Sequence, residues 1–248
     1  MKNISRLLFV LILFLFFQSF NFAQIPFAYK NAPVFISDLD GHVPKYVSEE
    51  QYDIIDALTG TTAFPVYPGF PVSSNYAVFS PKTGSIFCNM DADSELEIVF
   101  GSGTKLFAIN IDTTSVPGWP KVFAANYEVQ WTPSFGDIDG DGVGDVVVTA
   151  GGVPGGNIHA YHINGTIVTG FPVSVGRYPM SATLCDLDNN GSKEIIMGTR
   201  TGQVVVYNGN GTMYTGWPKQ MDRYVGASAA AGDVNNDGIP EIVIESRN

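Results

Sequence analysis

One acidic loop recurs four times along this chain, and the recurrence constrains the fold more than any other feature of the sequence. The clearest copy, residues 137–145, reads Asp-Ile-Asp-Gly-Asp-Gly-Val-Gly-Asp and has carboxylates at loop positions 1, 3, 5 and 9. Related loops occupy 89–97, 186–194 and 233–241, so successive loops begin 48, 49 and 47 residues apart. A fixed period of this length is typical of repeat architectures, in which each unit packs on its neighbours.

A second marker, Gly-(Phe/Trp)-Pro, repeats with nearly the same period. It begins at Gly69, Gly118, Gly170 and Gly216, in steps of 49, 52 and 46 residues. Two independent markers that share a period indicate a true structural repeat. We expect the aromatic residue of this corner to pack between adjacent units.

Each unit has the same order of short strands and turns. A strand of small residues, such as 227–232, leads into the acidic loop, and a β-branched strand such as 242–244 follows. A glycine turn, a third strand, an Asn-Gly hairpin turn and the aromatic corner come next, before a fourth strand. About four short strands per unit, without helical periodicity, predict an all-β chain whose units are blades of a β-propeller. The small first strand suits the crowded innermost position.

The N-terminus is typical of an export signal. Lys2 and Arg6 precede an eleven-residue apolar run, Leu7–Phe17, and a polar break follows. Because about 20 apolar residues are needed to span a bilayer, the run predicts a cleaved signal peptide, 1–23, and no membrane span after cleavage. We therefore expect a secreted, cell-surface or periplasmic protein. Residues 24–50 form an N-terminal segment of uncertain structure, before the repeats of 51–248.

The acidic loops have the chemistry of a hard-cation site. Alternating acids on a tight turn converge their oxygens on one point, as calcium requires, whereas magnesium demands a stricter octahedral geometry. An EF-hand is excluded, since it needs a glutamate at position 12 and flanking helices. Position 12 here is apolar in every loop, namely Phe100, Val148, Met197 and Ile244. The alternative without metal is a turn in which aspartates cap backbone N–H groups.

Residues 135–142, Phe-Gly-Asp-Ile-Asp-Gly-Asp-Gly, resemble the FG-GAP or VCBS repeats of integrin alpha-subunit propellers and of many secreted bacterial proteins. The resemblance covers roughly 52–248, with looser copies in which Asn89, Asn190 and Asn235 replace acids and Ser94 replaces a glycine. The family's propeller usually has seven blades. This chain holds four loops and parts of about five blades. We therefore expect a partial or open propeller, which is either a fragment of a longer protein or an arc that needs other strands to close.

The resemblance also implies a ligand set, with side chains at positions 1, 3, 5 and 9 and a backbone carbonyl at position 7. It implies one calcium ion per loop, up to four, with the tightest binding at 137–145, whose ligand charge is highest. The side-chain ligands would be Asn89, Asp91, Asp93, Glu97, Asp137, Asp139, Asp141, Asp145, Asp186, Asp188, Asn190, Glu194, Asp233, Asn235, Asp237 and Glu241, and the carbonyls would come from Glu95, Val143, Ser192 and Ile239.

The charge of the chain bears on its partners. The formal net charge is −11, and 14 of the 24 acidic residues lie within the four loops. The acidity is therefore concentrated at the candidate ion sites. Nucleic acid is excluded as a partner, because its recognition requires a basic surface.

Two functions fit these observations. The first is a calcium-stabilised, non-catalytic propeller that acts in adhesion or scaffolding and binds a protein or glycan. The second is the propeller portion of an extracellular carbohydrate-active enzyme whose catalytic residues lie elsewhere, since no catalytic residues are identified in this chain. Trp119, Trp131 and Trp217 could stack on sugars in the second case, but two of them recur in register as blade corners. The first function is therefore the preferred one.

Overall fold

The computed structural model describes residues 51–52, 72–73, 83–91, 93–152, 155–176 and 179–247. The predicted signal peptide and the segment 24–50 lie outside the described residues, as does the corner at Gly69. Every regular element described is a strand. The strands are β1 (Gln51–Tyr52), β2 (Val72–Ser73), β3 (Ser85–Cys88), β4 (Glu97–Ser102), β5 (Lys105–Ile109), β6 (Lys121–Val122), β7 (Glu128–Val129), β8 (Ser134–Gly136), β9 (Asp145–Gly151), β10 (Gly156–His162), β11 (Val173–Gly176), β12 (Thr183–Cys185), β13 (Glu194–Gly198), β14 (Gln203–Tyr207), β15 (Lys219–Gln220), β16 (Ala230–Gly232) and β17 (Glu241–Val243).

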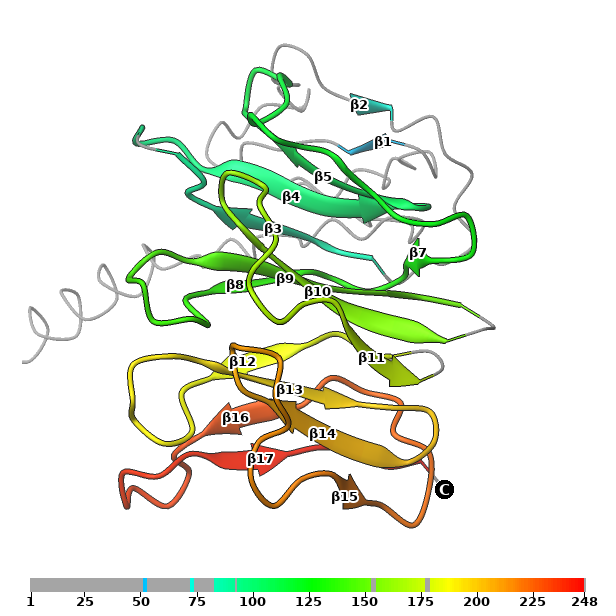
Figure 1. Cartoon of the computed structure of the whole chain (residues 1–248), viewed down its shortest axis with the longest axis vertical. Helices are drawn as coiled ribbons and strands as arrows, with labels where there is room; N and C mark the ends of the chain where they lie inside the picture. The colour runs from blue at the N-terminus through cyan, green and yellow to red at the C-terminus, as the bar shows by residue number, and fades with distance from the viewer. Residues whose placement is uncertain are drawn as a thin grey trace, which may run out of the picture.

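The strands form successive antiparallel sheets, one for each sequence repeat, as predicted. The orders are β3-β4-β5-β6, then β8, β9, β10 and β11, then β12-β13-β14-β15, and finally the pair β16-β17. Figure 1 shows these sheets following one another along the long axis of the molecule. The chain is all-β with blade-like sheets, and no contact between strands joins the β16-β17 sheet to β1–β6 among the described residues. An open arrangement of blades is therefore consistent with this structure.

The two largest hydrophobic clusters lie between sheets rather than within one of them. One buried cluster combines Val99 and Leu106 of the first full sheet with Val146 and Val148 of the next. A second cluster combines Val147 and Ile158 with Ile195, Met197 and Val205. Both faces of the central strands are thus covered, and all residues of β4, β9 and β13 are buried. Each blade depends on its neighbours for burial of its apolar side chains.

The first strands of successive blades lie side by side, which agrees with their predicted innermost position. Contacts join β3 to β8, β8 to β12, and β12 to β16. Hydroxyl groups bridge neighbouring blades here: Ser134 donates to the carbonyl of Ala182 at 2.6 Å, and Thr183 donates to that of Ala229 at 2.7 Å. Small residues let the backbones approach closely enough for these hydrogen bonds.

The Gly-aromatic-Pro corners pack between blades, as predicted. Trp119 is buried, and its indole N–H donates to the carbonyl of Ile163 in the next blade at 2.9 Å. Gly118 has a φ of +88°. A β-carbon at this position would collide with the carbonyl of Asn164, in the hairpin turn of the next blade. Only glycine fits a backbone in the left-handed region at so close an approach.

One strand was not expected from the sequence. The short strand β7 pairs Glu128 with Gly151 and Val129 with Ala150, at the end of β9 that β8 leaves unpaired. The second full sheet therefore has five strands instead of four. Within the part of the chain that is described, no helix has the length and apolarity needed to cross a membrane.

Candidate metal centre

All four acidic loops occupy the same place in their blades, between the innermost strand and the second strand. They connect β3 to β4, β8 to β9, β12 to β13 and β16 to β17. In Figure 1 they lie on the same side of the stacked sheets. The loops bring their polar side chains together because the two flanking strands pair directly: in every blade the residue before the loop faces position 9, as Gly136 faces Asp145.

The first acid of the loop holds the turn by accepting backbone N–H groups. The two carboxylate oxygens of Asp137 accept from Gly140 at 2.7 Å and from Gly142 at 2.9 Å. In the following two loops, Asp186 and Asp233 accept from Gly191 and Gly238 in the same way, both through Oδ2. Several of these glycines have positive φ, +85° at Gly142 for example, which explains the glycines in the motif.

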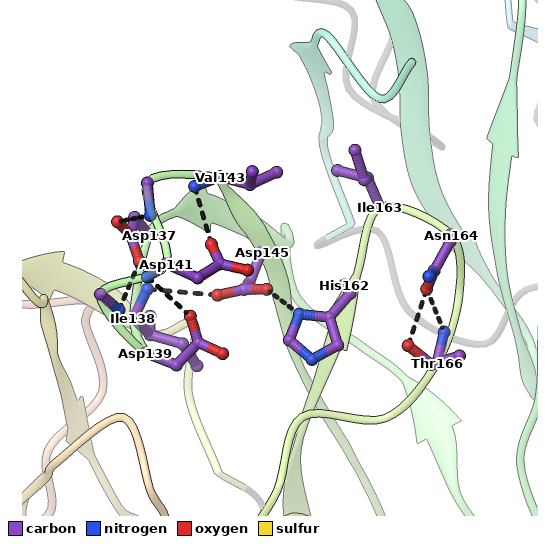
Figure 2. A network of polar contacts seen from close by, with 12 residues as sticks. Asp137, Ile138, Asp139, Asp141, Val143, Asp145, His162, Ile163, Asn164 and Thr166 are labelled. Carbon is purple, nitrogen blue, oxygen red and sulfur yellow. Dashed lines mark hydrogen bonds and ion pairs between the residues drawn. The ribbon is translucent and has the colours of Figure 1, made fainter. Parts of the chain in front are cut away.

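The side chains at positions 3 and 5 continue the pattern of hydrogen bonds. Asp139 accepts from the N–H of Asp141 at 3.3 Å, and Asp141 accepts from that of Val143 at 2.7 Å (Figure 2). Corresponding bonds to position 7 reach the N–H groups of Glu95, Ser192 and Ile239. These hydrogen bonds involve the N–H groups of the position-7 residues and not their carbonyls. Ligation of an ion by those carbonyls therefore stays a prediction.

The acid at position 9 is the most buried charged group of the loop. Glu97, Asp145 and Glu194 are each only 1% exposed. Their carboxylates accept the N–H of position 2, at 2.5 Å from Met90, 3.2 Å from Ile138 and 2.7 Å from Leu187. Burial raises the pKa of each of the three carboxyl groups, against the opposing effect of that hydrogen bond.

The structure brings many of the predicted ligands within reach of a single ion. Carboxylate oxygens lie within 4.8 Å of one another in three sets: Asp91, Asp93 and Glu97; Asp137, Asp139 and Asp141; and Asp186, Asp188 and Glu194. Within the described residues the loop 233–241 forms no such set of three charged groups. There the amide of Asn235 donates to Glu241 at 3.0 Å, and Val234 donates to the same carboxylate at 2.9 Å.

These donor sets fit a divalent cation. All donors are hard oxygen atoms, and each carboxylate oxygen that accepts one N–H retains a further lone pair. A buried carboxylate among other carboxylates is costly until a positive charge offsets it, which agrees with the raised pKa of the position-9 acids. The same N–H bonds would also form in a turn without metal, so that the hydrogen bonds alone do not separate the two interpretations.

One residue near the second loop was not identified from the sequence. His162, at the end of β10, pairs in register with Asp145, and its Nδ1 lies 2.9 Å from Asp145 Oδ1 (Figure 2). Asp139, Asp145 and His162 offer donor atoms within 4.8 Å of one another. The sequence carried little sign of this proximity, because His162 lies 17 residues beyond Asp145 and only the pairing of β9 with β10 joins them.

Comparison with known families agrees with this geometry. A family described as FG-GAP-like repeat matches residues 137–197 and, again, residues 186–244. Residues 137–244 are FG-GAP-like repeats. Each match begins on the first acid of a loop and ends just after the next loop, so each covers two acidic loops and the strands between them. The loop 89–97 lies outside both matches but has the same flanking strands and the same bond to its position-9 acid as the FG-GAP-like loops.

Solved structures give weaker similarities to the chain that carries these FG-GAP-like repeats. A protein of unknown function from Bacteroides caccae aligns over 55% of this chain and 46% of its own, with 16% identity and a TM-score of 0.36. BBS1N, solved in complex with ARL6DN and soaked with lead, aligns over 68% and 75%, with 13% identity and a TM-score of 0.39. At such TM-scores these alignments carry no argument about function. No curated protein sequence matches the chain.

Proposed function

We propose that this chain is an exported, calcium-stabilised propeller module that binds a protein or glycan ligand and performs no catalysis itself. The observation that carries the proposal is the recurrence of clustered carboxylates in equivalent loops, with a buried acid at position 9 of three of them. A cation in each loop would offset the repulsion within the cluster and tie the innermost strand to the second strand. Calcium is the ion that suits such oxygen-rich, flexible loops best.

The role assigned to the ion is structural. The loops connect strands whose side chains form the core between blades, and Ile138, inside the second loop, is itself buried in that core. Holding a loop in place therefore stabilises two blades at once. A ligand that binds the native state alone raises its stability, by about 2.7 kcal/mol at a concentration of 100 times the Kd.

The tryptophans offer little support for the enzymatic alternative. Trp119 is buried, and the ammonium group of Lys121 lies 5.2 Å from its ring centroid. Trp217 packs with the cluster between the last two sheets, and Lys219 approaches its ring at 5.8 Å. Neither ring is an open platform for a sugar. An open hollow borders the second and third loops; its lining includes Asp139, Asn190, Ser192, Asn208 and Asn210.

The structural role is tested by thermal unfolding of the full chain with and without chelator. We expect EDTA to lower Tm and calcium in excess to restore it. Asp137→Asn should reduce the calcium-dependent rise in Tm, while Asp112→Asn, in a hairpin turn outside the four loops, should not change it. An identical melting curve with and without EDTA would refute the proposal.

The binding role requires a separate experiment. Protein and glycan capture is compared for the calcium-loaded and the calcium-free chain, with the loop variant Asp137→Asn as a control for calcium dependence. Ligand retention that disappears together with calcium would support a calcium-stabilised binding module. Turnover of a glycan by the chain alone would contradict the non-catalytic assignment.

A further inference from the structure

The second acidic loop differs from the others in its position-9 acid and in the residue that faces it. Position 9 is Asp145 here and glutamate in the other three loops. The shorter side chain leaves a longer bond to the backbone, 3.2 Å from Ile138 N, compared with 2.5–2.9 Å in the other loops. The second oxygen of Asp145 instead meets the imidazole of His162 at 2.9 Å.

Asparagine stands at the position of His162 in the two neighbouring full sheets. By the strand registers, Asn110 lies opposite Glu97, and Asn208 lies opposite Glu194. The amide groups of both asparagines donate to threonine hydroxyls in their own hairpin turns, Thr114 and Thr212. They thereby close those turns. Of these three residues, His162 is therefore the one whose side chain bonds to the acid at position 9 of the loop.

We propose that Asp139, Asp145 and His162 form a site for a divalent transition-metal ion of the zinc type, which combines two acids of the calcium set of the same loop with an imidazole outside that set. The three donor atoms lie within 4.8 Å of one another. Two carboxylates and an imidazole are a donor set that zinc binds readily, whereas calcium takes oxygen ligands. Without a metal, a hydrogen on Nδ1 bridges that atom to Asp145 Oδ1. The ion would take the place of this hydrogen, and the imidazole would then be neutral, with its hydrogen on Nε2 and the lone pair of Nδ1 directed at the ion.

The burial of the three residues suits a site that is open on one side. Asp145 is 1% exposed and fixed between Ile138 N and the imidazole, while the His162 side chain is 29% exposed. Asp139 is exposed. Three protein ligands leave the fourth position of a tetrahedral zinc ion to water from the solvent side.

The zinc-type site and the proposed calcium site share some donors but not others. Asp139 and Asp145 belong to both sites, because position 9 is also a predicted calcium ligand, whereas Asp137 and Asp141 belong only to the calcium set and His162 only to the zinc-type site. The two ions therefore compete for one loop. The inference stands without the calcium proposal, because it depends on His162, which is not a calcium ligand, and variants of the unshared residues distinguish the failure of one from the failure of the other.

The test measures Zn²⁺ and Ca²⁺ binding to the metal-free full chain by titration calorimetry, with Co²⁺ as a spectroscopic probe. We expect His162→Asn, which introduces the residue of the neighbouring sheets, to weaken zinc binding at least tenfold and to remove the visible absorption of histidine-bound Co²⁺. Calcium affinity should not change. Asp137→Asn should have the opposite effect, weakening calcium and leaving zinc binding intact.

The control variant is His42→Asn, which lies outside the described residues and should leave Zn²⁺ and Co²⁺ binding as in the unaltered chain. Circular dichroism of each variant verifies the fold before titration. Equal Zn²⁺ affinity of the unaltered chain and His162→Asn, or the absence of Zn²⁺ binding to the unaltered chain, would overturn the proposal. Zinc binding that depends on His162 without any calcium binding would retain it and refute the calcium proposal alone.

Discussion

At the residue scale, the three hairpin turns that follow the third strands share the same side-chain hydrogen bonds but differ in the residue that takes the left-handed backbone conformation. Asp112, Asn164 and Asn210 each accept both the N–H and the hydroxyl of the threonine two residues later. One residue lies between the acceptor and the threonine. It is Gly165 or Gly211, with a φ of +79°, in two of the turns, and Thr113, with a φ of +72°, in the first. A β-branched residue is strained in this region, and glycine is not.

Replacing Thr113 with glycine is therefore expected to stabilise the protein. The relief of backbone strain outweighs the entropy that glycine loses on folding, and we expect about 1 kcal/mol in the free energy of unfolding by urea. The matched substitution Gly165→Ala, at the equivalent position of the next blade, should destabilise the protein. A lower urea midpoint for Thr113→Gly would show that the threonine side chain contributes packing that exceeds the strain.

His159 is a buried base, and its protonation should oppose folding. Burial between Phe123 and Tyr161 lowers the pKa of His159 to about 4 from its ordinary 6.5. At a pH between about 4 and about 6.5, His159 is protonated in the unfolded chain but neutral in the folded one. The free energy of unfolding therefore falls as the pH falls through this range.

The measurement is the free energy of unfolding as a function of pH, for the unaltered protein and for His159→Phe. We expect the difference between them to grow on acidification, reaching on the order of 3 kcal/mol near pH 4. Other titrating groups cancel in this difference. Parallel pH profiles would indicate that His159 titrates as it does in the unfolded chain.

At the element scale, the innermost strands are joined by hydroxyl groups that reach across neighbouring blades. Ser181 donates to the carbonyl of Thr132 at 2.7 Å, in addition to the bonds from Ser134 and Thr183. These strands are too short and too small for extensive apolar packing. The hydroxyl bridges therefore hold neighbouring blades in register where their backbones meet.

Thr183→Val should lower stability while preserving the shape of the side chain. The carbonyl of Ala229 loses its partner in a partly buried place, and we expect a cost of about 1–2 kcal/mol in urea unfolding. Ser174→Ala, at an exposed position of strand β11, is the control and should change the free energy by less than about 0.5 kcal/mol. Equal effects of the two substitutions would contradict the proposed contribution of the bridge.

At the scale of the whole molecule, the blades are energetically coupled because their cores lie between them. Met197 is fully buried in the cluster that joins the second and third full sheets, together with Ile138 of the second loop. Disturbance of this cluster should therefore affect both sheets and the loop. The bond from Lys193 N to the Asp137 carbonyl, 3.0 Å long, directly joins the loops of these sheets.

Met197→Ala is expected to destabilise the protein by about 2–5 kcal/mol, as for other large-to-small changes in a core. Since the cluster reaches Ile138, the variant should also bind calcium more weakly at the loop 137–145, measured by calorimetry. Val243→Ala, at an exposed position of β17, provides the comparison. Unfolding of the third sheet alone, with the remaining sheets and calcium affinity unchanged, would refute the coupling.

The sequence by itself determined the repeat, the all-β class and the composition of each loop. These features depend on residues that lie close together in the chain, such as the turn residues and the alternation of small and β-branched strands. They can be predicted from the sequence because each unit satisfies the same constraints separately. The turns follow from glycines at positions of positive φ, such as Gly118 and Gly142. The buried second strands follow from apolar residues such as Val148 and Met197.

Only the tertiary structure decided how the units act on one another. The pairing of β7, the hydroxyl bridges and the burial of Glu97, Asp145 and Glu194 depend on neighbours many residues away along the chain. The approach of His162 to Asp145 has the same origin, because strand register, and not sequence distance, sets which side chains meet. The acidic motif could thus be predicted residue by residue, whereas the histidine that distinguishes one of its copies could not.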